Sequence, residues 1–316
     1  MVVLNPTAGR GQGRRRRPEL EQLLTNAAFR FNSLKINGLK TNAEESLIWN
    51  IVETTTALRA TELAARAAVD GAMIVAAAGG DGTLNEVANG VVGTNALLGI
   101  LPLGTGNDFA RDLGLGTDLS ASVEALCFGA PRPIDLGKCN ERWFLNIAGC
   151  GFDAIVAQRV NHGFRFLRGT AAYIAAVAQS LIGLRAAEMR LTLDEETIEV
   201  RALMCSVCNT TCYGGGMKIA PNAKIDDGWF DICIISDAGR WEFLRTFPRV
   251  YKGTHTTHPK VRIIRARNVT IKSDRPLPLL IDGEVLGTTP VAFTLFPHAL
   301  RIMAPAHGSL HPNPSA

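Results

Sequence analysis

The stretch Gly79-Gly80-Asp81-Gly82-Thr83-Leu84-Asn85 directly follows an apolar run, Met73–Ala78, that predicts a buried strand. Its glycines let the backbone turn sharply and approach a ligand closely. From Thr83 to Val91 apolar side chains recur at helical spacing, so the turn opens a helix whose first N–H groups favour anionic charge. The stretch therefore predicts a phosphate-binding turn between a strand and a helix. An ordinary glycine turn of an α/β domain is the alternative.

Other apolar runs of the first third of the chain also end in polar or glycine-rich loops. Val2–Leu4 leads into Asn5–Gly9, and Leu97–Leu101 leads into Pro102–Asp108. Three adjoining threonines, beginning at Thr54, follow another short strand. The alternation of strands and helices predicts a mostly parallel α/β sheet. Because ligands bind outside the carboxyl ends of such strands, we expect these loops to converge on one crevice.

From about Pro131 the sequence changes to short alternating apolar runs joined by polar turns, which predict antiparallel strands. The runs span residues 189–193, 197–200, 229–235, 261–264, 269–271, 279–281 and 291–295. They favour a second domain of β-sandwich type. The expected divisions are an α/β domain over 1–130, which the C-terminal segment could complete, a β-sandwich over 131–304 and a tail over 305–316. Residues 31–46 are expected to form a loop or insertion, and 169–184 a helix.

The composition allows a large core and argues against several protein classes. The chain has 316 residues, 47% of them apolar, and its 33 basic against 29 acidic residues give a net charge of only +4. This charge is too small to indicate nucleic-acid binding, although it allows contact with anionic lipid. Without an apolar run of about 18 residues we expect neither a membrane span nor a signal peptide, and a cytoplasmic location. We expect the seven cysteines, including Cys205, Cys208 and Cys212, to be reduced, buried thiols.

Neither the P-loop pattern nor the dinucleotide pattern Gly-x-Gly-x-x-Gly occurs. Instead, an ordered set of motifs resembles the diacylglycerol kinase catalytic-domain family, which includes bacterial soluble lipid kinases and the sphingosine and ceramide kinases. The motifs are Asn5–Gly9, Gly79–Asn85, Leu103–Ala110, Lys224–Phe230 and Asp282–Glu284. The resemblance implies an N-terminal nucleotide-binding domain with a Rossmann-like parallel sheet, as in NAD kinases and phosphofructokinases. It also implies a C-terminal β-sandwich and an active site in the cleft between the two.

The resemblance further implies which residues bind the substrates. ATP would be held by Asn5, Pro6, Thr7, Ala8, Gly9, Thr54, Gly79, Gly80, Asp81, Gly82, Thr83, Leu84, Asn85 and Thr105. Asp81 would hold the catalytic Mg²⁺, because a bare carboxylate there would repel the phosphates. Glu284 would be the general base that takes the proton of a lipid hydroxyl. By itself, Asp282-Gly283 is a common turn dipeptide, so a hairpin-turn glutamate is the alternative.

A second metal is also implied by the resemblance. A structural Mg²⁺ would be bound by the Asp227 carboxylate and by the main-chain carbonyls of Lys224 and Trp229. So few protein ligands suit magnesium, which keeps several waters. A plain turn before the next strand is the alternative. His255 and His258 also resemble the family, and we expect them to have loop or interface roles rather than to bind metal.

These features lead to an expected function. The chain resembles an ATP- and Mg²⁺-dependent lipid kinase, acting peripherally at the inner face of the membrane on diacylglycerol or a related lipid. Alternative acceptors are a sphingoid base and a soluble nucleotide such as NAD, and a non-catalytic nucleotide-binding regulator is a second alternative. A homodimer is among the expected assemblies. The run Arg14–Arg17 would attract phosphate or anionic lipid, or form a solvated helix face.

Overall fold

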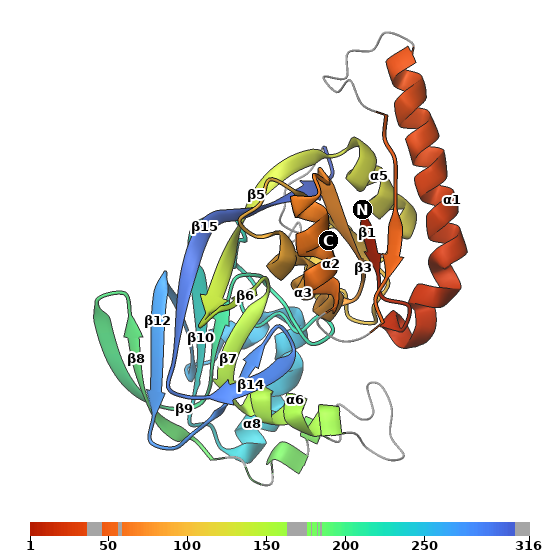
Figure 1. Cartoon of the computed structure of the whole chain (residues 1–316). Coiled ribbons are helices and arrows are strands. Elements are labelled where there is room, and N and C mark those ends of the chain that lie inside the picture. The colour runs from red at the N-terminus through yellow and green to blue at the C-terminus, as the bar shows by residue number, and fades with distance from the viewer. Residues whose placement is uncertain are drawn as a thin grey trace. The chain divides into compact units, whose positions relative to one another are not determined.

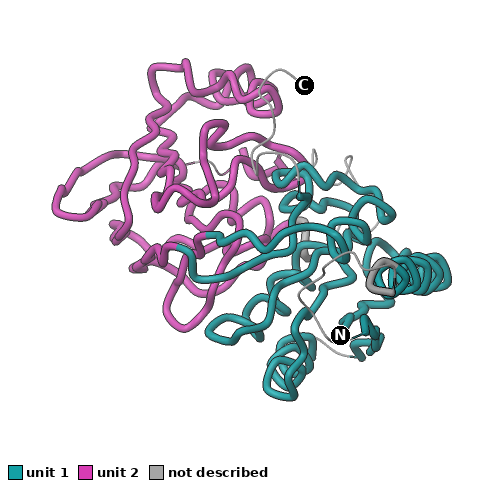
Figure 2. Tube along the Cα trace, turned by 90° about the horizontal axis from the view of Figure 1, so that it is seen from above, with its two compact units in different colours: residues 1–134, 298–316 teal, residues 135–297 magenta. Residues whose placement is uncertain are grey.

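The computed structural model describes residues 1–36, 46–55, 59–162, 176–177, 179–181, 183 and 185–306. The chain forms two compact units, unit 1 with Met1–Ile134 and His298–Ala316, and unit 2 with Asp135–Pro297 (Figure 2). It crosses between them within strands β5 (Ala130–Cys139) and β15 (Val291–Ala304). Residues 131–134 and 298–304, which the expected division placed in the second domain, belong to unit 1, and the C-terminal segment completes that unit, the option that the sequence left open.

Unit 1 contains the predicted parallel sheet (Figure 1). Its strands are β1 (Val2–Leu4), β2 (Ile51–Glu53), β3 (Ile74–Gly79) and β4 (Leu97–Pro102). β1 lies between β2 and β3, β3 also pairs with β4, and every one of these pairs is parallel. The end of β15 adds to β4, also in parallel, at Ile302 and Leu98. The expected α/β class is confirmed.

The helices of unit 1 follow the strands in alternation. They are α1 (Ala8–Ile36), α2 (Arg59–Val69), α3 (Asp81–Val91), α4 (Asp108–Asp112) and α5 (Leu119–Phe128). The alanines of α2, at 60, 64 and 67, are buried, as its alanine-rich pattern predicts. The loop expected over 31–46 is wrong for its first part, because α1 continues to Ile36. Residues 37–45 lie outside the described part of the chain.

Unit 2 is built from antiparallel strands, as the alternating runs predict. Besides parts of β5 and β15 they are β6 (Arg142–Phe144), β7 (Ile147–Gly151), β8 (Ala187–Leu193), β9 (Glu196–Cys208), β10 (Phe230–Ser236), β11 (Val261–Ala266), β12 (Asn268–Ser273), β13 (Pro278–Ile281) and β14 (Glu284–Thr288). The strands follow the order β14-β13-β7-β9-β8-β12-β15, and β10 joins β9 to β11. Phe144, Phe230 and Phe293 pack together in the core of this β-sandwich.

Helical segments of unit 2 cover one part of its strands. They are α6 (Phe152–His162), α8 (Arg240–Thr246) and the 3₁₀ segments η1 (Phe247–Lys252) and η2 (Thr254–Thr257). The helix expected over 169–184 lies mostly outside the described residues. All seven cysteines are buried and free, as predicted. None of the helices described has the length and apolar character needed to span a membrane.

Candidate active site

The loops that follow β1, β3 and β4 surround a cavity of about 280 Å³ in unit 1. Its lining is Asn5, Ala8, Gly9, Gly80, Asp81, Gly82, Thr83, Gly104, Thr105 and Gly106. The crevice expected at the carboxyl ends of the parallel strands is therefore present. Gly104 and Gly106 were not among the predicted site residues, although they lie in a quoted motif. The Gly-x-Gly spacing directly after β4 was the signal that could have identified them.

Close backbone packing explains the glycines of this cavity. A Cβ atom at Gly104 would lie 2.4 Å from the Cα atom of Gly80, so only glycine allows the two loops to meet. At Gly106 a Cβ atom would lie 3.0 Å from Oδ2 of Asp81. The backbones of two loops thus surround one carboxylate, leaving main-chain N–H groups and little side-chain bulk to face a ligand. This is an arrangement suited to phosphate.

Side-chain hydrogen bonds join the first loop to α3. Asn5 donates from Nδ2 to Thr83 Oγ1 at 3.0 Å. The Oδ1 atom of Asn5 accepts from the backbone N–H of Thr7 at 3.0 Å and from its hydroxyl at 2.8 Å. The hydrogen bond between Asn5 and Thr83 therefore fixes the separation of the two loops. Because the loops are already ordered, binding of a ligand costs less conformational entropy.

Asp81 opens α3 and reaches the start of α4. Its Oδ1 atom accepts from the backbone N–H of Phe109 at 3.2 Å. Asn107, just before α4, has a left-handed φ of 51° and exchanges hydrogen bonds of 2.9 and 3.0 Å with the backbone of Gly104. Asn107 was not among the predicted site residues, although Asn is one of the few residues that tolerate this conformation. It fixes the loop that carries Thr105.

Six of the residues predicted to bind ATP lie outside the cavity lining, namely Pro6, Thr7, Thr54, Gly79, Leu84 and Asn85. Thr54 lies at the end of β2, where its N–H donates to the carbonyl of Leu4 at 2.8 Å. Leu84 and Asn85 are buried on α3. Gly79 ends β3 beneath Thr83, whose Oγ1 would be 2.5 Å from a Cβ atom there. These residues shape the loops rather than line the cavity.

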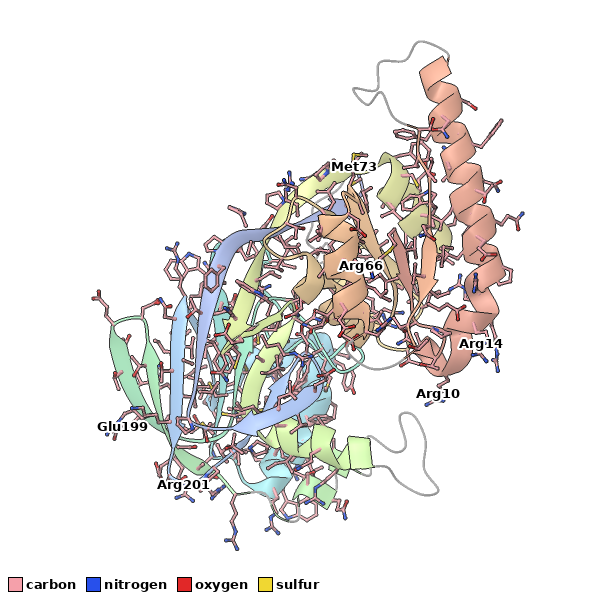
Figure 3. The ribbon with its side chains drawn as sticks, viewed as in Figure 1. Arg10, Arg14, Arg66, Met73, Glu199 and Arg201 are labelled. Carbon is pink, nitrogen blue, oxygen red and sulfur yellow. The ribbon has the colours of Figure 1, made fainter. Side chains whose placement is uncertain are left out.

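The basic run at the start of α1 is partly neutralised. Arg16 pairs with Glu19 at 2.8 Å, and Arg17 pairs with Glu21 at 2.8 Å. Arg10 and Arg14 project from the first turns of the same element (Figure 3), and neither has a carboxylate partner in the described chain. The second half of the run is therefore a solvated, paired helix face, whereas Arg10 directly follows Gly9 of the cavity lining.

Glu284 opens β14 after a two-residue turn, Asp282-Gly283, in which both residues have positive φ. Its carboxylate forms an ion pair with Arg142 on β6. The oxygens of Asp282 accept three backbone N–H groups, from Leu145, Asn146 and Ile147 at 2.8, 2.9 and 3.1 Å. Asp282 thereby ties the turn to the connection between β6 and β7. The predicted base lies on a firmly held hairpin of unit 2.

The residues of the predicted structural metal site lie in one turn before β10. Asp227 Oδ1 accepts from the backbone N–H of Trp229 at 3.1 Å, and its Oδ2 is paired with Arg265. Arg265 and Arg267 both lie against the ring of Trp229, at 5.6 and 4.4 Å from its centroid. The positive charge facing this carboxylate is thus a guanidinium, with which a metal ion at the same oxygen would compete.

An apolar cavity in unit 2 contains both histidines and one buried acid. The lining includes Asp153, Tyr213, His255 and His258 among mainly apolar residues. His255 Nε2 donates to the carbonyl of Ile219 at 3.1 Å, and burial lowers the pKa of its ring. Among the described residues no group of three or more His, Cys, Asp and Glu side chains is arranged to hold a metal ion.

Asp153 is the buried carboxyl group of this cavity. It accepts from the Ala154 N–H at 2.8 Å, and from the hydroxyls of Ser206 and Tyr213 at 3.3 and 3.4 Å. Burial raises its pKa to about 6, because the hydrogen bonds to the charged form offset only part of the desolvation cost. Asp153 has no signal in the sequence, since a single acid in an apolar stretch forms no pattern.

A glycine-lined cavity at the carboxyl ends of parallel strands and a separate β-sandwich are features of a class of kinases, and comparisons identify the family. Residues 1–139 match the diacylglycerol kinase catalytic domain, and residues 146–304 match the YegS C-terminal NAD kinase beta sandwich-like domain. The chain belongs to the diacylglycerol kinase family.

Individual relatives agree with this assignment. A diacylglycerol kinase of Staphylococcus saprophyticus is 30% identical, over 96% of this chain and 94% of its own length. A diacylglycerol kinase of Mycobacterium tuberculosis is 35% identical, over 79% of this chain and 82% of its own. The fold is shared with a crystal structure of a Bacillus anthracis diacylglycerol kinase, with a TM-score of 0.70 at 21% identity, covering 96% of this chain and 95% of that one.

Proposed function

We propose that the chain is an ATP- and Mg²⁺-dependent lipid kinase that transfers the γ-phosphoryl group of ATP to a hydroxyl of diacylglycerol or a related lipid. The observation that carries the proposal is the cavity of unit 1, where backbone groups of two glycine loops surround the carboxylate of Asp81. Phosphoryl transfer needs fixed donors and positioning more than covalent chemistry from the protein. The family supports the use of ATP.

The donor set of the cavity fits a nucleotide phosphate with its metal. The N–H groups that open α3 and the side chains of Thr83 and Thr105 would face the phosphate oxygens. Asp81 would hold Mg²⁺, which prefers carboxylate oxygens and would offset the negative charge of the phosphates. Its contact with the Phe109 N–H fixes the orientation of the carboxylate.

Glu284 is proposed as the general base. The lipid hydroxyl loses its proton to the Glu284 carboxylate while its oxygen bonds to the γ-phosphorus, and the bond to the β,γ-bridging oxygen breaks to release ADP. Arg142 would position the carboxylate through their ion pair. The rigid hairpin supports this role, because Asp282 ties it to the backbone at three points.

The apolar cavity of unit 2 supports a lipid as the acceptor. Phe152, Met204, Phe243 and Phe247 line it. Such a surface suits an acyl chain and offers little to a soluble nucleotide such as NAD. Since ATP is cytoplasmic and the proposed acceptor is a membrane lipid, we propose that the protein acts peripherally at the inner face of the membrane. The names of the relatives favour diacylglycerol as the acceptor.

The test is phosphate transfer from labelled ATP to micellar diacylglycerol, sphingosine and ceramide and to NAD. Wild type is compared with Glu284→Gln and with Glu196→Gln. Glu196 is a matched control, because it also opens a strand after a two-residue turn whose first residue is an aspartate with positive φ. We expect phosphorylated diacylglycerol, a loss of roughly a hundredfold or more in Glu284→Gln, and no loss in Glu196→Gln. ATP binding without any lipid product would contradict the proposal.

A further inference from the structure

The segment formed by α8 and η1, residues 240–252, has apolar side chains on two faces. Phe243, Phe247 and Val250 point inward and line the apolar cavity. Trp241, Leu244 and Tyr251 remain 80%, 40% and 44% exposed. Burying large apolar side chains is favourable, so the exposed parts of these side chains form a surface on which a partner could dock.

The charged residues of the segment are also divided between its faces. Arg240, Arg245 and Lys252 are exposed, and no carboxylate of the described chain pairs with them. Glu242, the one acidic residue of the segment, is held by Lys260 at 2.8 Å and lies 3.5 Å from His258. The outer face, defined as Arg240, Trp241, Leu244, Arg245, Tyr251 and Lys252, therefore combines aromatic and aliphatic groups with cations only.

We propose that this outer face of α8 and η1 docks on an anionic bilayer surface. Trp and Tyr are the residues enriched at the level of lipid headgroups, and exposed Arg and Lys are attracted by anionic headgroups. The inference rests on the proposed function in one respect, since an enzyme with a bilayer-embedded acceptor has to contact the bilayer. The same segment forms a wall of the apolar cavity, so docking would bring that cavity to the lipid.

A second copy of the chain is a less suitable occupant. In a symmetric dimer the same patch lies on both sides of the interface. The cations Arg240, Arg245 and Lys252 would then meet the same set of cations on the second copy, without carboxylates of the patch to offset the charge. An anionic bilayer supplies the opposite charge. Charge complementarity therefore favours the bilayer over a second copy of the chain as the partner of this face.

The first test is sedimentation with vesicles in the absence of ATP. Vesicles of phosphatidylcholine containing phosphatidylglycerol are compared with vesicles of phosphatidylcholine alone. We expect binding to the anionic vesicles, reduced on the order of tenfold or more in Arg240→Gln/Arg245→Gln. The control is Arg262→Gln/Lys272→Gln, which removes two exposed cations from strands of the same unit and should leave binding unchanged.

The second test addresses the apolar side chains. Trp241→Ala/Leu244→Ala should lose most of its vesicle binding, whereas Met73→Ala, at a position 60% exposed in unit 1, should not. The wild-type tryptophan fluorescence should shift to the blue on adding anionic vesicles, and Trp241→Phe should lose this shift although its other tryptophans remain. Thermal unfolding of each variant shows whether it is folded.

The readouts separate this inference from the proposed function. If the outer-face variants bind anionic vesicles as wild type does, or if wild type does not bind them, the docking surface is wrong, whatever the kinase assay shows. Vesicle binding that depends on these residues, without lipid phosphorylation, would support the surface while overturning the proposed function. If light scattering shows that wild type is dimeric and that Trp241→Ala/Leu244→Ala is monomeric, the face is a protein interface instead.

Discussion

Arg142 and Glu284 form an ion pair within unit 2, with Arg142 Nη2 2.8 Å from Glu284 Oε2. The two residues lie on β6 and β14, which are distant in sequence. The side chain of Glu284 is 44% exposed, so the pair contributes little to stability. Its main effect is to restrict the rotamers of the carboxylate that we propose as the base.

Arg142→Gln tests this positioning role. We expect kcat for lipid phosphorylation to fall roughly ten- to a hundredfold while KM for ATP stays constant, because a misplaced base slows the chemical step. Arg142→Lys should recover part of the rate. Arg190→Gln, which removes an exposed arginine from its ion pair with Glu199, should leave kcat unchanged. An unchanged kcat in Arg142→Gln would show that Glu284 needs no partner.

Gly104→Ala tests the close approach of the two loops. The added Cβ atom would lie 2.4 Å from the Cα atom of Gly80, so the backbone must shift. We expect a loss of about 1–3 kcal/mol in unfolding free energy, together with weaker ATP binding measured by calorimetry. Gly82→Ala is the control for stability, since a Cβ atom there meets nothing within 4 Å. Equal stability of the two variants would contradict the packing argument.

Arg265 and Asp227 offer a test of the structural metal site. Because Arg265 already supplies a positive charge to Asp227, we expect the melting temperature of the wild type to be nearly the same in EDTA and in millimolar Mg²⁺. Arg265→Met exposes the carboxylate to other cations and should make the melting temperature depend on Mg²⁺. A clear stabilisation of the wild type by Mg²⁺ would show instead that the metal displaces the guanidinium.

Asp153 makes stability depend on pH. Burial raises its pKa from 3.8 in the unfolded chain to about 6. The folded state therefore holds this proton more tightly, so the contribution of Asp153 to stability is greatest below pH 4 and is lost as the pH rises through about 6. The shift corresponds to at most about 3 kcal/mol. The difference in unfolding free energy between the wild type and Asp153→Asn should decrease by up to this amount between pH 4 and pH 7. A difference that is constant with pH would contradict the raised pKa.

The sequence patterns predicted the repetitive parts of the fold. Strands β3 and β8 were found where the sequence predicted them. The apolar residues are continuous in β3 and alternate in β8, and such a pattern by itself indicates which faces of a strand are buried. The end of α1 was not predicted. Residues 31–36 continue the helix although their apolar spacing is weak, so the pattern gave no clear signal there.

The sequence predicted which loops form the candidate site, but not the contacts and distances between their residues. Glycine motifs after strands are local signals, and the loops carrying Asn5, Asp81 and Thr105 do line one cavity. The contacts of Asn107 and Asp282 carry no such signal. Their functions depend on the backbone groups of Gly104 and of residues 145–147 that folding brings to them.

The order of the motifs, the α/β and β-sandwich classes and the chemical types of the site residues were determined by the sequence itself. These properties depend on local composition and periodicity, which are known without the distances between residues in the folded chain. Only the tertiary structure decided that Glu284 is paired with Arg142, that Asp227 is paired with Arg265 and that one face of α8 and η1 is exposed. Charge partners and exposure come from long-range packing, because the attraction between two side chains depends on their separation in space and not along the chain.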